Sequence, residues 1–448
     1  MIMALLYAPH DFHTAMHIIN TAGWDTDCNS GNVGCLVAII NGLGCFENGP
    51  DWLGPLADRA IISSADGGYS MNSCTRIAYD LTNLGRQLAN AAPLSAPKHG
   101  AQCHFSLTGG VQGFQATRNA LNPSIVEVQQ GVDETGRPGL HIHLRGLTHA
   151  VPAAEVLTQV FTPPELVSAP TYDLMATPLV NPGQTIKAVC RAERTNTAAV
   201  AAQIRIKAYG PNDGLLTFDG PSITIQPGDE RIVEWVVPDA LDSQPIQKLG
   251  VALAAPEGCF HGVVWVDSLS WSGAPRVSIR KPSNAPGHLW HRAWVHGADH
   301  FFHSSPLDPF HIAQDHGEGI ITFGTRDWTD YRVLVPRLTV RLATPAGLAV
   351  RVQGLRRYYA LVFKRNGRVA LIKARDEARI EIASADFDWE FDVGYQVSVE
   401  VRGSRLTASV TGGPVVEATD GAYVDGGIGL VAVDGSVSAN RFDVSPIN

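Results

Sequence analysis

The chain has 448 residues, of which 45% are hydrophobic and 17% charged, and its formal net charge is −9. The hydrophobic content excludes a wholly disordered chain, and the acidic balance disfavours a nucleic-acid surface, so no nucleic-acid partner is expected. No apolar run reaches the ~20 residues that a membrane-spanning helix needs, so no membrane partner is expected either. At about 150 residues per domain, the length predicts roughly three domains.

The first predicted domain, residues 1–92, is helical. Apolar residues recur at helical spacing over residues 11–20, 31–43 and 73–92. In the last of these segments Ile77, Leu81, Leu84 and Leu88 share one stripe. Residues 93–102 contain two prolines, Pro93 and Pro97, and a glycine, Gly100, and they have the composition of a linker.

The rest of the chain is predicted to be β-structure. Apolar and polar residues alternate over segments such as 201–208, 231–237, 338–342 and 396–402, with Gly- and Pro-rich turns between them. Such alternation is typical of antiparallel sandwiches that face a core on one side and water on the other. We expect one sandwich over residues 103–276, a Pro-rich linker over 277–289 and a second sandwich over 290–448.

The seven cysteines are Cys28, Cys35, Cys45, Cys74, Cys103, Cys190 and Cys259. Their odd number and irregular spacing do not predict a disulfide framework, and no pair has the CxxC spacing of a thiolate zinc site. Free thiols are typical of a reducing compartment, so a cytoplasmic location is expected.

The most specific local string is Gly23-Trp-Asp-Thr-Asp-Cys-Asn-Ser-Gly31, directly before an apolar helix. The carboxylates of Asp25 and Asp27 can converge on a hard cation, and backbone N–H groups at the start of the helix suit an anionic ligand. The alternative is an acidic loop in which Asp27 or Asn29 acts as the N-cap of the helix.

This string, followed by Gly34-Cys-Leu-Val-Ala-Ile-Ile-Asn-Gly42, resembles the C-terminal part of the ADP-ribosylglycohydrolase family. The resemblance implies part of an all-α fold and Mg²⁺-dependent hydrolysis of a glycosidic bond to ADP-ribose. It implies that Asp25 and Asp27 are catalytic metal ligands, and that an ADP-ribosylated substrate or an ADP-ribose-like ligand is the partner. Cys28 stands where the family often has a hydroxyl ligand, and a thiol is a poor ligand for Mg²⁺.

The resemblance covers only residues 1–92. The early Thr-Asp-Asp metal motif of the family has no counterpart, because the 448 residues contain no Asp-Asp dipeptide. We therefore expect a truncated family member, a split-gene product or an inactive relic. Its site is expected to be incomplete, and a partner chain is a candidate source of the missing helical half. Whether this chain alone is an enzyme stays open.

The two β blocks suggest an alternative function. Residues 103–275 resemble jelly-roll modules of sugar-acting enzymes, through His104-Phe-Ser-Leu107, Pro182-Gly-Gln-Thr185 and Val264-Trp-Val-Asp-Ser-Leu-Ser-Trp271. Residues 310–445 are similar to concanavalin A-like or laminin-G-type sandwiches, through Gly324-Thr-Arg-Asp-Trp-Thr-Asp-Tyr331 and Tyr395-Gln-Val-Ser-Val-Glu-Val-Arg-Gly403. The alternative is thus a non-catalytic protein that binds glycan or another macromolecule. Exposed Trp or Tyr residues would stack on sugar rings, and core tryptophans are the competing interpretation.

Three further groups are weaker candidates. His10, His13 and His17 lie nearly on one helical face and form either a metal patch or, as we expect, part of a packed helix. Seven histidines between His288 and His316 follow no zinc-site spacing. Asp267 is either a structural cation ligand or, as we expect, part of a turn at a strand end.

Overall fold

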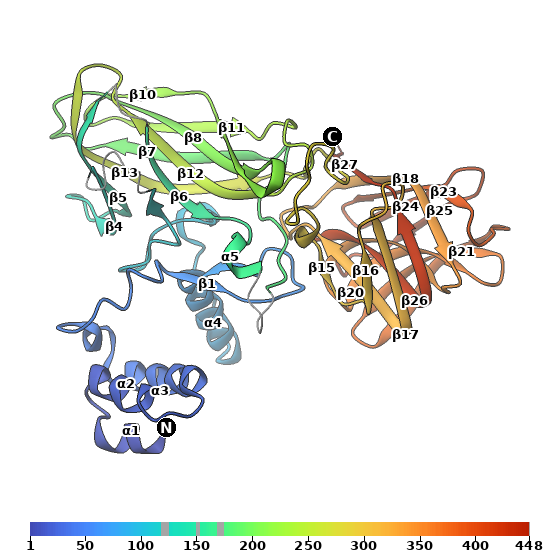
Figure 1. Cartoon of the computed structure of the whole chain (residues 1–448), viewed down its shortest axis with the longest axis horizontal. Helices are drawn as coiled ribbons and strands as arrows, with labels where there is room; N and C mark the ends of the chain where they lie inside the picture. Colours follow the sequence, from blue (N-terminus) through green and yellow to red (C-terminus); the bar gives the residue numbers. More distant parts are fainter. Residues whose placement is uncertain (118–124, 149–152, 168–173, 448) are drawn as a thin grey trace. The chain divides into compact units, whose positions relative to one another are not determined.

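The computed structural model describes residues 1–117, 125–148, 153–167 and 174–447. The chain divides into two compact units, Met1–Ala57 and Asp58–Asn448 (Figure 1). Among the described residues, every helix longer than four residues ends by residue 88, and most of the second unit is antiparallel β-sheet. This confirms the predicted class of a short helical segment followed by two sandwiches. None of the described helices is long and apolar enough to cross a membrane.

The first unit is a small helical cluster. Its elements are α1 (Ile2–Tyr7), α2 (Phe12–Asn20), α3 (Thr26–Asn41) and the 3₁₀ turn η1 (Leu43–Phe46). The Asp11 carboxylate caps α2 by accepting a hydrogen bond from the Thr14 N–H at 3.0 Å. Phe12, Met16 and Ile19 of α2 pack against Val33 and Val37 of α3. The predicted helices are confirmed, and α3 begins at Thr26, inside the acidic string.

The second unit opens with a hairpin and a helix. Strands β1 (Arg59–Ile61) and β2 (Met71–Ser73) pair antiparallel, and α4 (Cys74–Leu88) follows directly. Ser73 caps α4 by accepting from the Arg76 N–H at 3.1 Å. The Asp58 carboxylate accepts from the Thr75 N–H at 3.0 Å and from the Gln112 N–H at 3.0 Å. These bonds attach the start of α4 to the loop that leads into the first sandwich.

The predicted apolar stripe of α4 is exposed, not buried. The exposed fractions are 64% for Leu81, 56% for Leu84 and 87% for Leu88. The opposite, polar side of the helix faces the rest of the second unit, as described below. This apolar face is therefore available to another helix.

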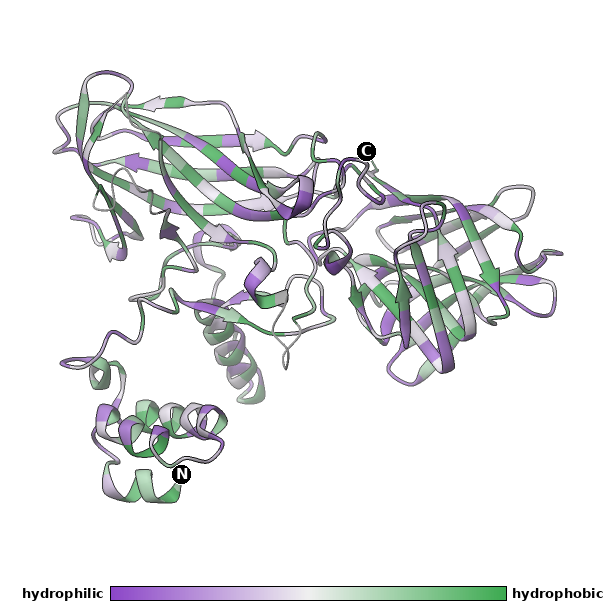
Figure 2. Cartoon of the chain, viewed as in Figure 1, coloured by the Kyte–Doolittle hydropathy of each residue, from purple (hydrophilic) through white to green (hydrophobic). Residues whose placement is uncertain are grey.

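The first sandwich has two antiparallel sheets around one core. One sheet has the order β10-β8-β12-β6-β3, with β9 paired to β8, and the other has the order β11-β7-β13-β5-β4. The strands are β3 (Gln115–Ala116), β4 (Val126–Val132), β5 (Pro138–Thr148), β6 (Ala154–Gln159), β7 (Thr185–Ala192), β8 (Val200–Tyr209), β9 (Leu215–Asp219), β10 (Ile223–Ile225), β11 (Glu230–Val236), β12 (Ile246–Ala254) and β13 (Cys259–Ser272). Short helical pieces are α5 (Pro164–Val167) and η3 (Pro211–Asp213). Hydrophobic and hydrophilic residues alternate along the strands, as Figure 2 shows.

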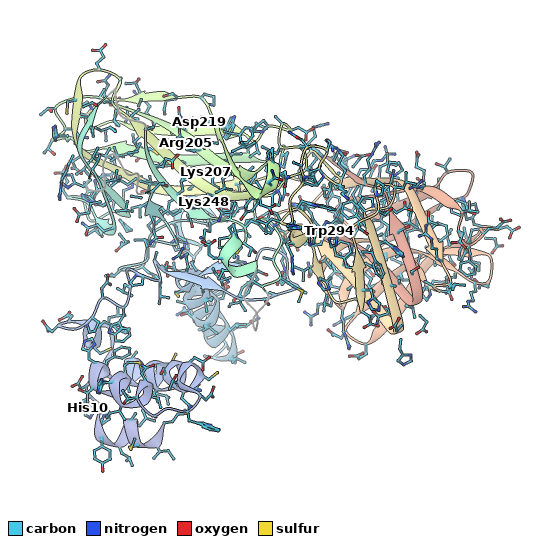
Figure 3. The ribbon with its side chains drawn as sticks, viewed as in Figure 1. His10, Arg205, Lys207, Asp219, Lys248 and Trp294 are labelled. Atoms are coloured by element: carbon cyan, nitrogen blue, oxygen red, sulfur yellow. The ribbon has the colours of Figure 1, made fainter. Side chains whose placement is uncertain are left out.

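Charged side chains occupy the outer face of the first of these sheets. Arg205 binds Asp219 at 2.6 Å and Glu155 at 2.8 Å, and Lys207 binds Glu155 at 2.7 Å. Figure 3 labels Arg205, Lys207 and Asp219 together with Lys248 of β12. The pKa of Lys248 is lowered, first by burial and then by the charge of Lys207. The outer face is thus polar and internally paired, as expected for a one-sided sheet.

The second sandwich is one continuous, folded sheet. Its strands are β14 (Val277–Ile279), β15 (Val295–His296), β16 (His300–Phe302), β17 (Phe310–Phe323), β18 (Tyr331–Arg341), β19 (Ala346–Gly354), β20 (Arg357–Lys364), β21 (Arg368–Arg375), β22 (Ala378–Asp386), β23 (Gly394–Arg402), β24 (Arg405–Val410), β25 (Val415–Thr419), β26 (Gly427–Ala439) and β27 (Phe442–Pro446), with the 3₁₀ turn η4 (His291–Ala293). The long β26 pairs with β19 through residues 427–432 and with β18 through residues 436–439. This change of partner lets one strand belong to both faces of the sandwich. Trp294, labelled in Figure 3, is 2% exposed in the core.

Both segments predicted as linkers contain ordered structure. Residues 93–102 include the 3₁₀ turn η2 (Pro97–Gly100), from which Lys98 Nζ reaches Asp267 Oδ1 at 2.6 Å. Residues 277–289 include β14, which pairs with β27 of the second sandwich. Proline-rich composition indicated flexibility here, but backbone pairing and ion pairs hold both segments in place. The remaining domain boundaries stay predictions.

The Asp267 ion pairs provide a test of the first sandwich. Asp267 is 5% exposed and binds both Lys98 and Arg137 Nε, the latter at 2.9 Å. We expect Asp267→Asn to lower the free energy of unfolding by about 2–3 kcal/mol, because two cations lose a buried partner. Glu230→Gln removes the exposed partner of Arg137 and should cost less than about 1 kcal/mol. Urea unfolding followed by tryptophan fluorescence measures both, and equal costs would contradict the prediction.

Candidate functional site

The acidic loop of the first unit is shaped by local contacts. Gly23 (φ 74°) and Asp25 (φ 44°) both adopt left-handed backbone conformations, which turn the chain sharply into α3. Asn29 Nδ2 donates to the Trp24 carbonyl at 3.2 Å, and Ser30 Oγ donates to Asn20 Oδ1 at 2.9 Å. These two bonds join the loop to α3 and to the end of α2. Asn29 therefore orients the loop, whereas the Trp24 side chain is 82% exposed.

The loop brings its three candidate ligands together. Ligand atoms of Asp25, Asp27 and Cys28 all lie within 4.8 Å of one another, and all three residues are exposed. Within the described ranges, this is the one group of at least three such side chains that could hold a metal ion. The N-cap of α3 is Asp25, and its side chain makes no capping hydrogen bond. The prediction that Asp27 or Asn29 is the N-cap is therefore wrong, and metal binding by the loop stays a prediction.

The chemistry of these donors fits a hard cation in part. Carboxylate oxygens are the donors that Mg²⁺ prefers, so Asp25 and Asp27 fit. The negative charges of Asp25 and then Asp27 raise the pKa of Cys28 above its ordinary value. Cys28 therefore stays a neutral thiol at neutral pH and does not fit as a third ligand for Mg²⁺. Two exposed carboxylates make a weak site, because most of the coordination shell is left to water.

The three histidines near the N-terminus do not form a metal patch. His13 Nδ1 accepts a hydrogen bond from the Trp52 indole at 3.0 Å, and Nε2 lies 3.0 Å from the Glu47 carbonyl. Both ring nitrogens of His13 are thus engaged in packing. His10 Nδ1 lies 3.3 Å from Asn41 Oδ1, between the start of α2 and the end of α3. The expectation of a packed helix is confirmed.

The histidines of the second sandwich also lack a convergent arrangement. His291 and His303 stack in parallel, with ring centroids 3.6 Å apart. Burial lowers the pKa of His291 to about 3 and also lowers the pKa of His303. Both rings are therefore neutral, and among the described residues no group that could hold a metal ion includes these histidines. Asp267, the candidate cation ligand, is neutralised instead by Lys98 and Arg137.

The tryptophans of the sandwiches are mostly core residues. Six of the seven beyond residue 230 are at most 9% exposed, namely Trp265, Trp271, Trp290, Trp294, Trp328 and Trp389. Trp235 is the seventh and is partly exposed. The core interpretation is confirmed for these six, so they offer no open platform for a sugar ring.

A second candidate site was not predicted from the sequence. A cavity of about 420 Å³ lies in the second unit between α4, residues 94–104, the end of β6 and the loop 325–327. Its lining comes from residues more than 200 positions apart in the chain, and no local pattern joins them. We return to this cavity below.

One family model matches the N-terminal part of the chain. Residues 1–90 match the family model described as ADP-ribosylglycohydrolase, which confirms the resemblance for this part of the chain. The match covers 90 of 448 residues, and it includes the acidic loop and α4. No curated protein matches the chain.

Solved structures resemble parts of the chain only at low identity. The carbohydrate-binding module CBM66 from Bacillus subtilis is 15% identical, covers 34% of this chain and 94% of its own, and has a TM-score of 0.30. The CBM22-2 xylan-binding domain of Paenibacillus barcinonensis Xyn10C is 13% identical, with coverages of 37% and 94% and a TM-score of 0.26. The CBM22-1-CBM22-2 tandem of the same protein is 8% identical, with coverages of 77% and 96% and a TM-score of 0.27. These similarities are too low to carry a ligand from those proteins to this chain.

The raised pKa of Cys28 can be tested by alkylation. The thiolate is the reactive form, and removing a neighbouring negative charge lowers the pKa of the thiol. We expect Asp25→Asn to accelerate iodoacetamide labelling of Cys28 at pH 8 severalfold, and Asp27→Asn to do so less. Peptide-resolved mass spectrometry reads the rate, with Cys35 of the same helix as internal reference. An unchanged rate in Asp25→Asn would contradict the electrostatic account.

Proposed function

We propose that residues 1–90 contribute part of a Mg²⁺-dependent ADP-ribosylglycohydrolase site, with Asp25 and Asp27 as its metal ligands. The observation that carries this proposal is the convergence of the two carboxylates, on a loop inside the segment that matches the family model. The substrate class is an ADP-ribosylated molecule or an ADP-ribose-like ligand. The reaction is hydrolysis of the glycosidic bond at the ribose anomeric carbon.

Each group of the loop has a chemical task in this proposal. When bound, Mg²⁺ would polarise ribose hydroxyls and lower the pKa of a coordinated water. Asp25 and Asp27 hold two negative charges side by side at the surface. The backbone N–H groups in the first turn of α3, whose N-cap side chain makes no hydrogen bond, favour an anionic group such as a diphosphate.

The site is incomplete within this chain, and a second helical chain would complete it. Two carboxylates do not fix the geometry of a metal-activated water. Exposed apolar residues on the helices support such a partner, since an amphipathic helix ordinarily buries its apolar face. They are Leu6, Tyr7, Ile39, Ile40, Leu81, Leu84 and Leu88. We assign catalysis to the completed site and place it in the cytoplasm, in keeping with seven free cysteines.

Metal binding by the loop is tested with the full chain. Calorimetric titration with MgCl₂ should give weak binding that strengthens when ADP-ribose is present, because the ligand adds oxygen donors. The Asp25→Asn/Asp27→Asn variant should lose this binding. Glu47→Gln is the matched control, since it removes an exposed carboxylate of the same unit outside the loop. Mg²⁺ and ADP-ribose binding that survives the double variant would exclude the loop as the site.

The exposed stripe of α4 is tested by polar substitution. Leu84→Gln/Leu88→Gln should change the free energy of unfolding by less than about 1 kcal/mol, because both side chains are already in water. Urea unfolding followed by circular dichroism measures this change. A large loss of stability would mean that the chain buries this stripe itself, leaving no face for a partner.

We propose glycan binding by the second unit as the second candidate function. The buried tryptophans do not favour the sandwich faces as its site. The specific observation in its favour is the cavity beside α4, whose size falls in the range typical of ligand pockets.

A further inference from the structure

The cavity beside α4 is lined by several separate segments of the second unit. One face of α4 contributes residues at helical spacing, namely Arg76, Tyr79, Asp80 and Asn83. The other walls come from residues 94–104, Gln159 of β6, Trp271 of β13 and the loop 325–327. In Figure 1, α4 lies below the first sandwich and next to β1.

Polar contacts fix these walls in place. Arg326 binds the Asp66 carboxylate with two hydrogen bonds of 2.7 Å. Asp327 accepts from the Trp271 indole at 3.2 Å, and Gln102 Nε2 donates to the Trp271 carbonyl at 2.9 Å. The cavity therefore exists before any ligand arrives, which reduces the entropic cost of binding.

The accessible polar groups offer both donors and acceptors. Arg76 and Asp80 lie one helical turn apart on α4, and their side chains are roughly half exposed. Arg76 Nε lies 4.0 Å from Asp80 Oδ2. At this distance the carboxylate keeps lone pairs free to accept. Nη1 of Arg76 donates to the Gly68 carbonyl at 2.8 Å, and the other nitrogens of the guanidinium keep N–H groups to donate. Deeper in the wall, Asn72 Nδ2 and Gln159 Oε1 are a donor and an acceptor that find no partner among the described residues. Both atoms are buried below the cavity surface, so the accessible donors and acceptors are those of Arg76 and Asp80.

The formal charge of the lining is zero. Arg76 and Arg326 are its cations, and Asp80 and Asp327 are its anions. His104, 6% exposed, lines the same cavity, and burial lowers its pKa and keeps it neutral. A diphosphate brings acceptors only, so it can pair with the two guanidinium groups but not with the two carboxylates, which would repel it. A cationic amine brings donors only, and the two guanidinium groups would repel it.

We propose that this cavity is a binding site for a neutral saccharide. A sugar hydroxyl donates one hydrogen bond and accepts two, so adjacent hydroxyls can pair with Asp80 and Arg76 at once. The half-buried ring of Tyr79, held edge-on to His104 at 5.2 Å, supplies an apolar wall for the carbon face of the sugar. This inference rests on the second proposed function and places glycan recognition at the helix–sandwich junction instead of on a sandwich face.

The test uses the full chain and alanine variants of α4. An array of neutral mono- to tetrasaccharides identifies the best binder, whose affinity is then measured by saturation-transfer NMR and calorimetry. Asp80→Ala and Tyr79→Ala should each weaken binding about tenfold or more, the loss expected for a desolvated polar contact. Alanine favours helix, so α4 should persist. Gln87→Ala, at an exposed position of α4 outside the cavity, is the matched control.

The outcomes separate the inference from the function on which it rests. Loss of binding in both cavity variants, with Gln87→Ala unchanged and circular dichroism preserved, supports the site. Saccharide binding that persists in both variants overturns the cavity but leaves glycan binding standing. Binding of ADP-ribose or inorganic phosphate that depends on Asp80 and Tyr79 overturns the ligand class. Absence of binding across the neutral array overturns the inference and the second proposed function together.

Discussion

The hydrogen bonds of the Asp58 carboxylate hold the N-terminal segments of the second unit together. One oxygen accepts from the Thr75 N–H, and the other accepts from Thr75 Oγ at 2.6 Å and from the Gln112 N–H. The Gln112 side chain continues the network by accepting from the N–H groups of His104 and Phe105. Burial raises the pKa of Asp58 despite these hydrogen bonds. One partly buried acid thus joins the start of α4 to the segment that lines the cavity.

This attachment sets which face of α4 is covered. Amphipathic helices ordinarily pack by their apolar stripe, because burial of apolar area drives association. In α4 the anchored end instead directs Arg76, Tyr79 and Asp80 toward the cavity and leaves Leu84 and Leu88 in water. The same helix therefore presents a polar face to the cavity and an apolar face to solvent. The polar face of α4 lines the proposed glycan site, and its apolar face is the proposed contact with a second helical chain.

The two candidate sites differ in their electrostatics. The acidic loop concentrates two carboxylates at the surface, and their charge raises the pKa of the adjacent Cys28 thiol. The cavity instead balances two guanidinium groups against two carboxylates within a fixed wall. We accordingly propose a cation as the ligand of the first arrangement and a neutral polar molecule as the ligand of the second. The segment that matches the family model contributes to both, since it contains the loop in the first unit and α4 in the second.

Local patterns in the sequence were sufficient to predict the main helices and strands and the acidic loop. Helical spacing located α2, α3 and α4, and alternation located the strands, because both patterns reflect contacts between residues near in the chain. The Asp25–Asp27–Cys28 cluster could be predicted for the same reason, since its geometry arises from bonds such as that of Asn29 to Trp24.

Contacts between residues far apart in the sequence determine which side chains are buried, which charges pair and where the cavity forms. Only the tertiary structure shows that the α4 stripe is exposed, that Asp267 is neutralised by Lys98 and Arg137, and that six tryptophans are buried. The cavity likewise joins Asn72, Gln159 and Asp327, which no spacing rule connects. Burial and charge pairing depend on which surfaces meet, and a sequence determines this only through the complete fold.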